Sequence, residues 1–252
     1  MIQNLTTGRL LPLKTARNTR TLGGYPAGAG RVTSSRLLRG DCFMPLSAPD
    51  RRHLLALGID TVVDLREDGE RGGVPSGLCG ILRVRCYHIP LLPAGRGDSS
   101  AFPPDFTLGE LYVEILDRSK TAVALVFRRI ALKASAPDGR LLFHCSAGKD
   151  RTGVIAALLL ALAEVDEELI VRDYSETDAN LLPVLDRLRA SSSASAETFL
   201  HAGRENMEQM LRHLRGTYGG AAAYLSAAGL SAGEMRAVTD MMVATERKTA
   251  IL

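Results

Sequence analysis

The chain contains few cysteines, and their positions exclude two common kinds of site. Its 252 residues include only Cys42, Cys79, Cys86 and Cys145. No two of them form the Cys-x2-Cys pair that is typical of zinc sites, and they are too few for a disulfide framework in a chain of this length. We therefore expect no metal site, no disulfide framework and a reducing compartment.

Long hydrophobic runs are also missing. The longest apolar stretch, Val154 to Ala163, is too short to span a bilayer, which takes about 20 residues. Residues 1–14 contain no apolar core of signal-peptide length. We expect a soluble, cytoplasmic protein without membrane insertion, and secretion by a route that needs no signal peptide stays open.

Neither sign of charge dominates the composition. Lys and Arg number 31 and Asp and Glu number 28, which gives a formal net charge of +3 and a mild attraction for anionic substrates. Basic and aromatic residues are not interleaved as in single-strand binders, so nucleic acid is not an expected partner. With 46% apolar and 23% charged residues, the chain can bury one large core, and residues 1–252 are predicted to form a single domain.

The most informative segment is the decapeptide His144–Gly153, which reads His-Cys-Ser-Ala-Gly-Lys-Asp-Arg-Thr-Gly. It lies between the apolar run Leu141–Phe143 and the apolar stretch 154–163, a pattern that predicts a strand, a loop and a buried helix starting near Arg151. Cysteine is nucleophilic as its thiolate, which cationic groups and a helix N-terminus stabilise. Because Cys145 comes just before such a helix, it is predicted to be a nucleophile.

The same loop has the features of an anion site. Ala147 and Gly148 allow close backbone approach, so several N–H groups can turn towards a phosphate. Arg151 adds a bidentate, permanently charged fork. The residues predicted to bind the phosphate are Ser146, Ala147, Gly148, Lys149, Asp150 and Arg151.

The Cys-x5-Arg loop resembles the signature of the protein tyrosine phosphatase superfamily. Its Gly-Lys-Asp-Arg-Thr-Gly ending is most similar to the bacterial branch of tyrosine and phosphoinositide phosphatases. Asn18–Gly24 resembles that branch's Asn-x-Arg-Asp-Leu-Gly-Gly, with Thr21 in place of the aspartate. Further segments that match family blocks are Arg39, Leu57–Arg66, Asp173–Tyr174, Tyr218–Gly219 and Tyr224–Leu225. The resemblance therefore spans nearly the whole chain.

This resemblance implies a phosphatase that needs no cofactor. The Cys145 thiolate would attack phosphorus, Arg151 and backbone N–H groups would bind the phosphoryl oxygens, and water would hydrolyse the phosphocysteine. A phosphorylated protein and a phosphoinositide both remain open as substrates, since Lys149 adds a positive charge that resembles phosphoinositide phosphatases. Arg20, Arg39 and Arg66 are further cations, available either to substrate or to ion pairs. The sequence does not predict the oligomeric state.

Such a reaction also needs an acid to protonate the leaving oxygen. Asp150, inside the loop, is the favoured candidate. Asp98 and Asp105 lie between strand and helix, where the wider superfamily has its mobile acid loop. Asp64 is another candidate, although it can equally orient Arg66 through a salt bridge.

Two neighbours of the nucleophile have predicted supporting roles. The resemblance implies that the Thr152 hydroxyl lies near the Cys145 sulfur and donates to the thiolate as it leaves phosphorus. A first-turn helix residue without such a role is the other interpretation. His144 is expected to support the loop by hydrogen bonding rather than to act as a base.

Other functions fit the loop less well. A Walker A loop requires glycine and Ser or Thr at positions where Phe143 and Asp150 stand. A rhodanese-like sulfurtransferase also has a cysteine in an anion-binding loop, but Lys-Asp-Arg-Thr-Gly before an apolar helix is not its pattern. A non-catalytic module that binds phosphorylated ligands stays open, because the acid is not identified.

The order of apolar and turn-forming segments predicts an α/β fold. We expect a tyrosine-phosphatase-like central sheet flanked by helices, with a helical C-terminal part. Within it, residues 166–204 are predicted to contain a helical lid over the site. The local predictions are a helix capped by Ser47 and ending near Gly58, strands at Thr61–Leu65 and around Val84–Cys86, a helix capped by Ser119, an amphipathic helix with Met207 and Leu214 that stops near Gly216, and a capping box at Ser231.

Overall fold

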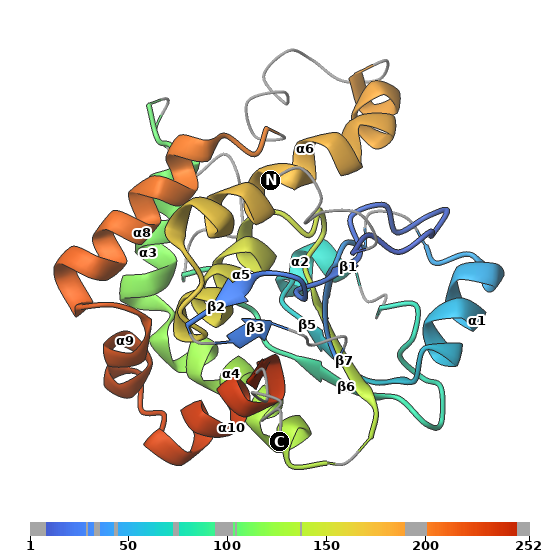
Figure 1. Ribbon diagram of the computed structural model, residues 1–252. Coiled ribbons are helices and arrows are strands. Elements are labelled where there is room, and N and C mark those ends of the chain that lie inside the picture. Colours follow the sequence, from blue (N-terminus) through green and yellow to red (C-terminus); the bar gives the residue numbers. More distant parts are fainter. Residues whose placement is uncertain are drawn as a thin grey trace, which may run out of the picture.

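A five-stranded sheet forms the centre of the protein (Figure 1). The computed structural model describes residues 9–28, 30–32, 36–42, 45–72, 76–93, 103, 105–136, 138–189 and 201–245. The strands of the sheet, in spatial order, are β1 (Arg20–Thr21), β4 (Leu37–Gly40), β7 (Arg140–His144), β5 (Ile59–Asp64) and β6 (Arg85–His88).

The central strand β7 ends at the predicted catalytic loop. It pairs in parallel with β4 and β5, β6 extends the sheet in parallel beyond β5, and β1 is antiparallel to β4. Gly40 and Asp64 both lie opposite His144 in the register, so all three strands finish at the same edge. The loop that follows therefore starts at the carboxyl edge of an almost entirely parallel sheet, where α/β proteins place their ligands.

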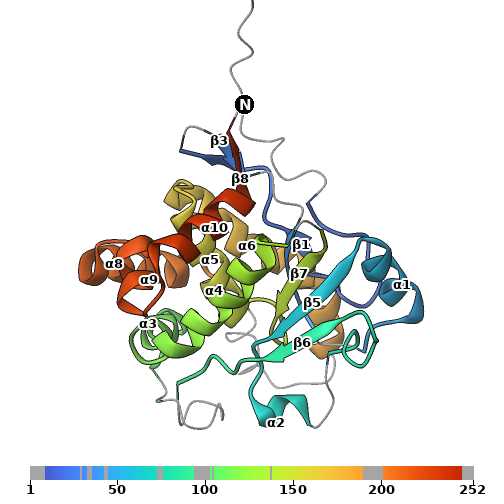
Figure 2. The ribbon, with the colours of Figure 1, turned by 90° about the horizontal axis from the view of Figure 1, so that it is seen from below.

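Helices cover the two faces of this sheet unequally. Figures 1 and 2 both show α1 (Ala48–Ala56) on one side and most of the helices on the other. The larger side contains α3 (Leu108–Arg118), α4 (Lys120–Ala134), α5 (Asp150–Leu162), α8 (Arg204–Tyr218), α9 (Ala221–Ala227) and α10 (Ala232–Met242). Its core is built around α5, in which Val154 to Leu160 are buried without a break. The predicted α/β fold with a helical C-terminal part is confirmed.

A small second sheet connects the two ends of the chain. It consists of β2 (Pro26–Ala27), β3 (Gly30–Val32) and β8 (Val243–Thr245), all antiparallel. Val32 lies opposite Val243 in this sheet and is buried in the main core. The N-terminal segment and the end of the helical part are thereby joined.

Most local predictions agree with the structure. Ser47 caps α1 by accepting a hydrogen bond from the Asp50 N–H at 3.2 Å, and Ser231 forms the expected capping box on α10. Ser119 stands at the N-cap of α4 but makes no side-chain capping bond, because it also ends α3. Helix α8 continues past Gly216 and ends at Gly219, whose φ of +80° suits a helix terminus.

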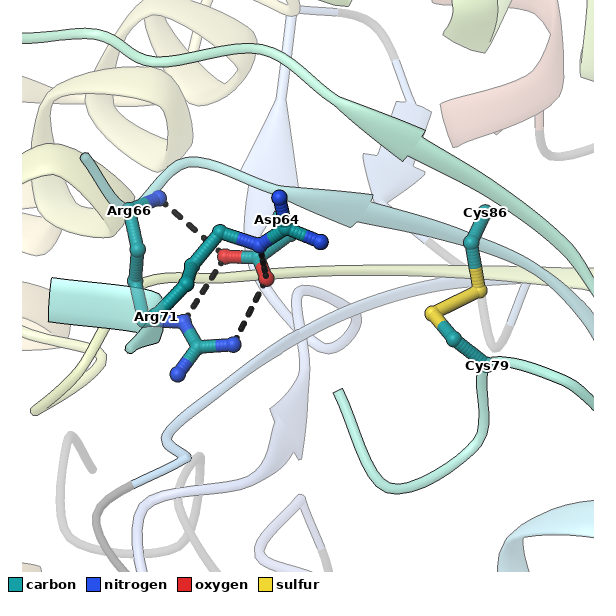
Figure 3. The surroundings of a disulfide bond; sticks show 5 residues. All are labelled: Asp64, Arg66, Arg71, Cys79 and Cys86. Atoms are coloured by element: carbon teal, nitrogen blue, oxygen red, sulfur yellow. Dashed lines mark hydrogen bonds and ion pairs between the residues drawn. A yellow bond between two sulfur atoms is a disulfide. The ribbon is translucent and has the colours of Figure 1, made fainter. Parts of the chain in front are cut away.

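One pair of cysteines is bonded, which the sequence did not predict. Cys79 and Cys86 form a disulfide between the loop after α2 (Asp68–Arg71) and strand β6 (Figure 3). Cys42 and Cys145 are free. The count and spacing of the cysteines gave no sign of the bond, which depends on the turn that brings residues 79 and 86 together. Disulfides persist in oxidising surroundings, so this one weakens the case for a reducing compartment.

The segment predicted to contain a lid is mainly helix α6 (Glu167–Arg189). Ile170, Val171 and Tyr174, in its first half, are buried in the main core. Residues 190–200, with the serine-rich run, lie outside the described residues, and the lid stays a prediction. Within the described part of the chain, no helix is long and apolar enough to cross a membrane.

Candidate active site

The predicted loop connects β7 to the N-terminus of α5. Cys145 follows the strand directly and is only 1% exposed, and Asp150 and Arg151 begin the helix. The buried thiol therefore belongs to the short loop that leads into the positive end of a buried helix. This is the strand, loop and helix arrangement that the decapeptide predicts.

Outward hydrogen bonds hold the loop in its curved shape. The Cys42 N–H donates to Ser146 O at 2.8 Å, and Asn18 Nδ2 donates to Ala147 O at 3.0 Å. Arg39 Nη2 donates to Gly148 O at 2.8 Å. Because the N–H and C=O of a peptide unit point in opposite directions, carbonyls held outward leave N–H groups available to an anion inside the loop.

Glycine is required at one position of the loop. Gly148 has a φ of +66°, and a Cβ there would lie 2.7 Å from the carbonyl carbon of Gly40. The backbone of β4 thus touches the loop at a point where no side chain fits.

Arg151 is held by a carboxylate that the sequence did not indicate. Glu70, on α2, accepts hydrogen bonds from both terminal nitrogens of Arg151, with Nη2 2.6 Å from Oε1. Ser146 Oγ donates to the same Oε1 at 2.8 Å. Burial disfavours the charged form of Glu70, but the bond from Arg151 outweighs it and lowers the pKa of Glu70. Arg151 Nε makes no hydrogen bond within the described chain, which leaves the other edge of the guanidinium for a phosphate.

Asp150 lies at the entrance of the loop and is held by a phenol. Tyr112 OH, from α3, donates to Asp150 Oδ1 at 2.6 Å, and Lys149 Nζ lies 3.4 Å from the same oxygen. Lys149 is 1% exposed, and its ammonium also donates to His201 O at 3.2 Å. The charge of Lys149 is therefore buried beside Asp150, and a role in substrate selection stays a prediction.

Two of the three unassigned arginines belong to a buried ion cluster. Asp173, on α6, pairs with Arg9 at 2.7 Å and with Arg39, and Arg20 Nη2 donates to Asp173 O at 2.7 Å. Burial disfavours ionised Asp173, but the arginine charges outweigh it and hold its pKa below the ordinary range. Arg39 thus contacts the loop and Arg20 contacts Asn18 behind it, and both side chains are buried.

The remaining acid candidates make no hydrogen bond or ion pair with the loop side chains in the described part of the chain. Asp64 forms the salt bridge with Arg66 that was the second interpretation, at 2.7 Å, and Arg71 Nε is 3.4 Å away (Figure 3). Asp105 is exposed before α3 and makes no hydrogen bond or ion pair with another described residue. Asp98 lies outside the described residues. Of these aspartates, only Asp150 is in the described loop.

Among the described residues, His144 makes a contact that suits its predicted role, whereas Thr152 makes no hydrogen bond to the Cys145 thiol. His144 is 1% exposed, burial lowers its pKa, and its Nδ1 lies 3.1 Å from Cys145 O, a contact that suits the predicted support of the loop. Thr152 Oγ1 is buried and has no hydrogen-bond partner among the described residues, the Cys145 sulfur included. Its bond to the leaving thiolate stays a prediction.

Sequence reasoning missed Glu70, Tyr112 and Asn18. Glu70 contacts Arg151 across 81 positions and Tyr112 contacts Asp150 across 38, so no local spacing marks either pair. Asn18 does belong to the N-terminal segment that resembles the phosphatases, which was the one available signal. Among the residues with described positions, no group of three His, Cys, Asp or Glu side chains could hold a metal ion.

Several known proteins are similar to this chain. The crystal structure of TpbA from P. aeruginosa is 22% identical, covers 58% of this chain and 72% of that chain, and gives a TM-score of 0.36. The triple specificity protein phosphatase PtpB of Mycobacterium tuberculosis is 25% identical over 257 residues, covering 81% of this chain and 89% of that protein. A tyrosine-protein phosphatase of Nostoc commune is 35% identical over 207 residues, covering 76% of this chain and 68% of that protein. The tyrosine phosphatase family itself matches residues 11–244. The chain therefore belongs to the tyrosine phosphatase family, whose members are phosphoric monoester hydrolases.

Proposed function

We propose that the protein hydrolyses phosphate monoesters through a phosphocysteine on Cys145. The observation that carries this proposal is the buried Cys145 thiol at the N-terminus of α5, with Arg151 fixed beside it by Glu70. A nucleophile and a bidentate cation on one short loop suit attack on a bound phosphoryl group.

In the first step the thiolate attacks phosphorus in line with the leaving oxygen. The S–P bond forms as the P–O bond breaks, and protonated Asp150 gives its proton to the leaving oxygen. The guanidinium of Arg151 and the N–H groups of residues 146–151 bind the equatorial oxygens, on which charge is redistributed.

In the second step water attacks the phosphocysteine. Asp150, now a carboxylate, accepts a proton from the water as the P–S bond breaks. Inorganic phosphate and the Cys145 thiolate are released, and Asp150 is protonated again for the next turnover. The Thr152 hydroxyl is the donor proposed for the returning thiolate.

The proposed substrates are phosphotyrosine in proteins and phosphoinositides. PtpB, a relative at 25% identity, is a triple specificity phosphatase by name, which supports testing a broad panel. The cytoplasmic location is also a proposal, with secretion by a route that needs no signal peptide as its alternative. The disulfide supports that alternative, because such bonds persist in oxidising surroundings.

Phosphate release tests the proposal directly. Wild type and Cys145→Ser are compared on phosphotyrosine, phosphoserine and phosphoinositide substrates, with a chelator present. We expect release that is lost with Cys145→Ser and is insensitive to the chelator. Unchanged release by Cys145→Ser would refute the covalent mechanism. No release by wild type would favour the non-catalytic phospholigand-binding module, or a sulfurtransferase, which a thiosulfate-to-cyanide assay detects.

A further inference from the structure

Two buried tyrosines connect Asp150 to the interior of the protein. Tyr112 OH donates to Asp150 Oδ1 at 2.6 Å, and Tyr174 OH lies 2.7 Å from Tyr112 OH. Tyr112 is 0% and Tyr174 1% exposed. They come from α3 and α6, which both pack against α5, the helix that begins with Asp150. Three helices therefore meet at one carboxyl group.

The direction of this hydrogen-bond chain follows from proton counting. A phenol has one proton, and that of Tyr112 is donated to Asp150. Tyr174 must then be the donor in its contact with Tyr112. Burial and the charge of Asp150 raise the pKa of Tyr112 well above its usual value, so this phenol stays protonated. The order is Tyr174 to Tyr112 to Asp150, in which each bond polarises the next.

The two oxygens of Asp150 have different surroundings. Tyr112 OH donates a hydrogen bond to Oδ1, and the closest approach of the Lys149 ammonium, an ion pair at 3.4 Å, is to the same oxygen. Oδ2 accepts no hydrogen bond from the part of the chain that the structure describes. A carboxyl group that accepts hydrogen bonds at one oxygen carries its own proton on the other. This arrangement favours Oδ2 as the oxygen that carries the transferable proton.

We infer that Tyr112 and Tyr174 are positioning residues for proton transfer by Asp150. This inference rests on the proposed function, in which Asp150 is the acid. The hydroxyl of Tyr112 fixes the carboxyl plane so that Oδ2 carries the proton to the leaving oxygen. When the O–H bond at Oδ2 breaks, negative charge appears on the carboxylate, and the Tyr112 hydrogen bond at Oδ1 stabilises it. Tyr174 acts only through Tyr112.

Removal of the hydroxyls separates this role from packing. The two rings meet edge to face with centroids 5.9 Å apart, a contact that phenylalanine can also make. Tyr112→Phe and Tyr174→Phe therefore keep the rings and remove the hydrogen bonds. Tyr224→Phe is the matched control, because Tyr224 is equally buried and its hydroxyl donates to Leu116 O, a backbone acceptor on α3 outside the site.

The experiment measures kcat on aryl phosphates whose leaving phenols differ in acidity. A strongly acidic phenol leaves without a proton, whereas a weakly acidic one needs the acid. Asp150→Asn should lose activity mainly on weakly acidic phenols, and Tyr112→Phe should show the same pattern with a loss of about tenfold. The basic limb of the kcat profile should move to higher pH in Tyr112→Phe, because the carboxylate loses a stabilising donor.

Tyr174→Phe should have a smaller effect in the same direction. The double variant should be no worse than Tyr112→Phe alone, since the second hydroxyl acts through the first. Additive losses, or a Tyr112→Phe enzyme with the leaving-group dependence and pH profile of Tyr224→Phe, would overturn the positioning role. The proposed function fails separately, if Cys145→Ser keeps its activity. Equal losses on all leaving groups in Asp150→Asn would overturn Asp150 as the acid and the positioning role with it, but not the phosphocysteine.

Discussion

Arg151 depends on Glu70 for its direction. Glu70 occupies both terminal nitrogens of the guanidinium and also accepts from Ser146, so one carboxylate connects α2 to both ends of the loop. The long arginine side chain would otherwise sample several rotamers, at a cost in entropy when phosphate binds. Glu70 thereby holds the guanidinium in one orientation before substrate arrives.

Glu70→Gln tests this orientation. A neutral amide has only one acceptor oxygen and cannot form two charge-assisted bonds with Arg151. We expect kcat/KM to fall by about ten- to a hundredfold, with correct folding. Steady-state kinetics measures the loss, and Glu110→Gln, an exposed cap of α3, is the control that should leave kcat/KM unchanged. A rise in activity would show that Glu70 instead competes with the substrate.

Gly148→Ala tests the contact between loop and β4. The added Cβ would collide with the backbone of Gly40, and the φ of +66° disfavours alanine. We expect a displaced loop and a loss of about a hundredfold or more in kcat/KM, since small misplacements of reacting groups have such costs. Gly216→Ala, on α8 with no atom within 4 Å of its added Cβ, should instead raise stability by about 0.5–1 kcal/mol. Comparable activity of the two variants would contradict a tight loop.

Residues within the decapeptide were predictable from sequence, and their partners were not. Cys145 and Arg151 carry their chemistry in their type and their spacing. Nothing in the local sequence marks Glu70 or Tyr112 as a partner of the loop, because each contacts it only when α2 and α3 fold against it. The partner of Asp64 could be predicted, because Arg66 is only two residues away in the chain.

Helix α6 supports the site through two adjacent residues. Asp173 holds Arg39, which donates to the loop carbonyl of Gly148, and Tyr174 contacts Tyr112. The Tyr174 ring also packs on the first turn of α5, where a Cβ on Gly153 would lie 3.0 Å from it. The Asp-Tyr pair found in the sequence is therefore a support for the loop rather than a substrate contact.

Asp173→Asn should destabilise the protein in a pH-dependent way. Removal of the charge leaves buried arginines uncompensated, at a cost of about 3–5 kcal/mol near neutral pH. Because the pKa of Asp173 is lowered in the folded state, its contribution is present above its unfolded value and is lost as pH falls through and below about 4. Denaturant unfolding from pH 3 to 7 should show a constant difference in the free energy of unfolding above about pH 5 and a difference that begins to narrow below about pH 4. Glu168→Gln removes an exposed ion pair made by the same helix and should change the free energy of unfolding little. A difference in unfolding free energy between wild type and Asp173→Asn that is the same at pH 3 and pH 7 would contradict this role of Asp173.

Element boundaries were predictable where a local cap sets them. Ser47 and Ser231 cap their helices within four residues of sequence, and both predictions hold. The end of α8 was placed too early, at Gly216, because its glycine lies in an exposed helix interior and the true terminus is the left-handed Gly219. Strand β6 begins at Arg85, close to the predicted segment, and its first two residues are exposed because it is the edge strand of the sheet and Cys86 joins the disulfide.

The Cys79–Cys86 disulfide depends on the fold and could not be predicted from the number and spacing of the cysteines. It closes a short loop with a sequence separation of 7, so its stabilisation lies at the low end, about 2 kcal/mol. We expect Cys79→Ser/Cys86→Ser to lose that amount in free energy of unfolding and to keep its activity. Thiol titration of the denatured, unreduced protein should detect Cys42 and Cys145 alone. Reactivity of all four thiols without reductant would show that the bond is absent.

The assignment of Cys145 as the nucleophile is tested most directly by trapping the phosphocysteine. Wild-type protein is mixed with excess aryl phosphate, quenched in acid within milliseconds, digested and analysed by mass spectrometry. The account predicts a transient phosphoryl adduct on the peptide that contains Cys145, absent in Cys145→Ser and longer-lived in Asp150→Asn. Turnover with no adduct on Cys145 at any quench time, or an adduct on another residue, would contradict it.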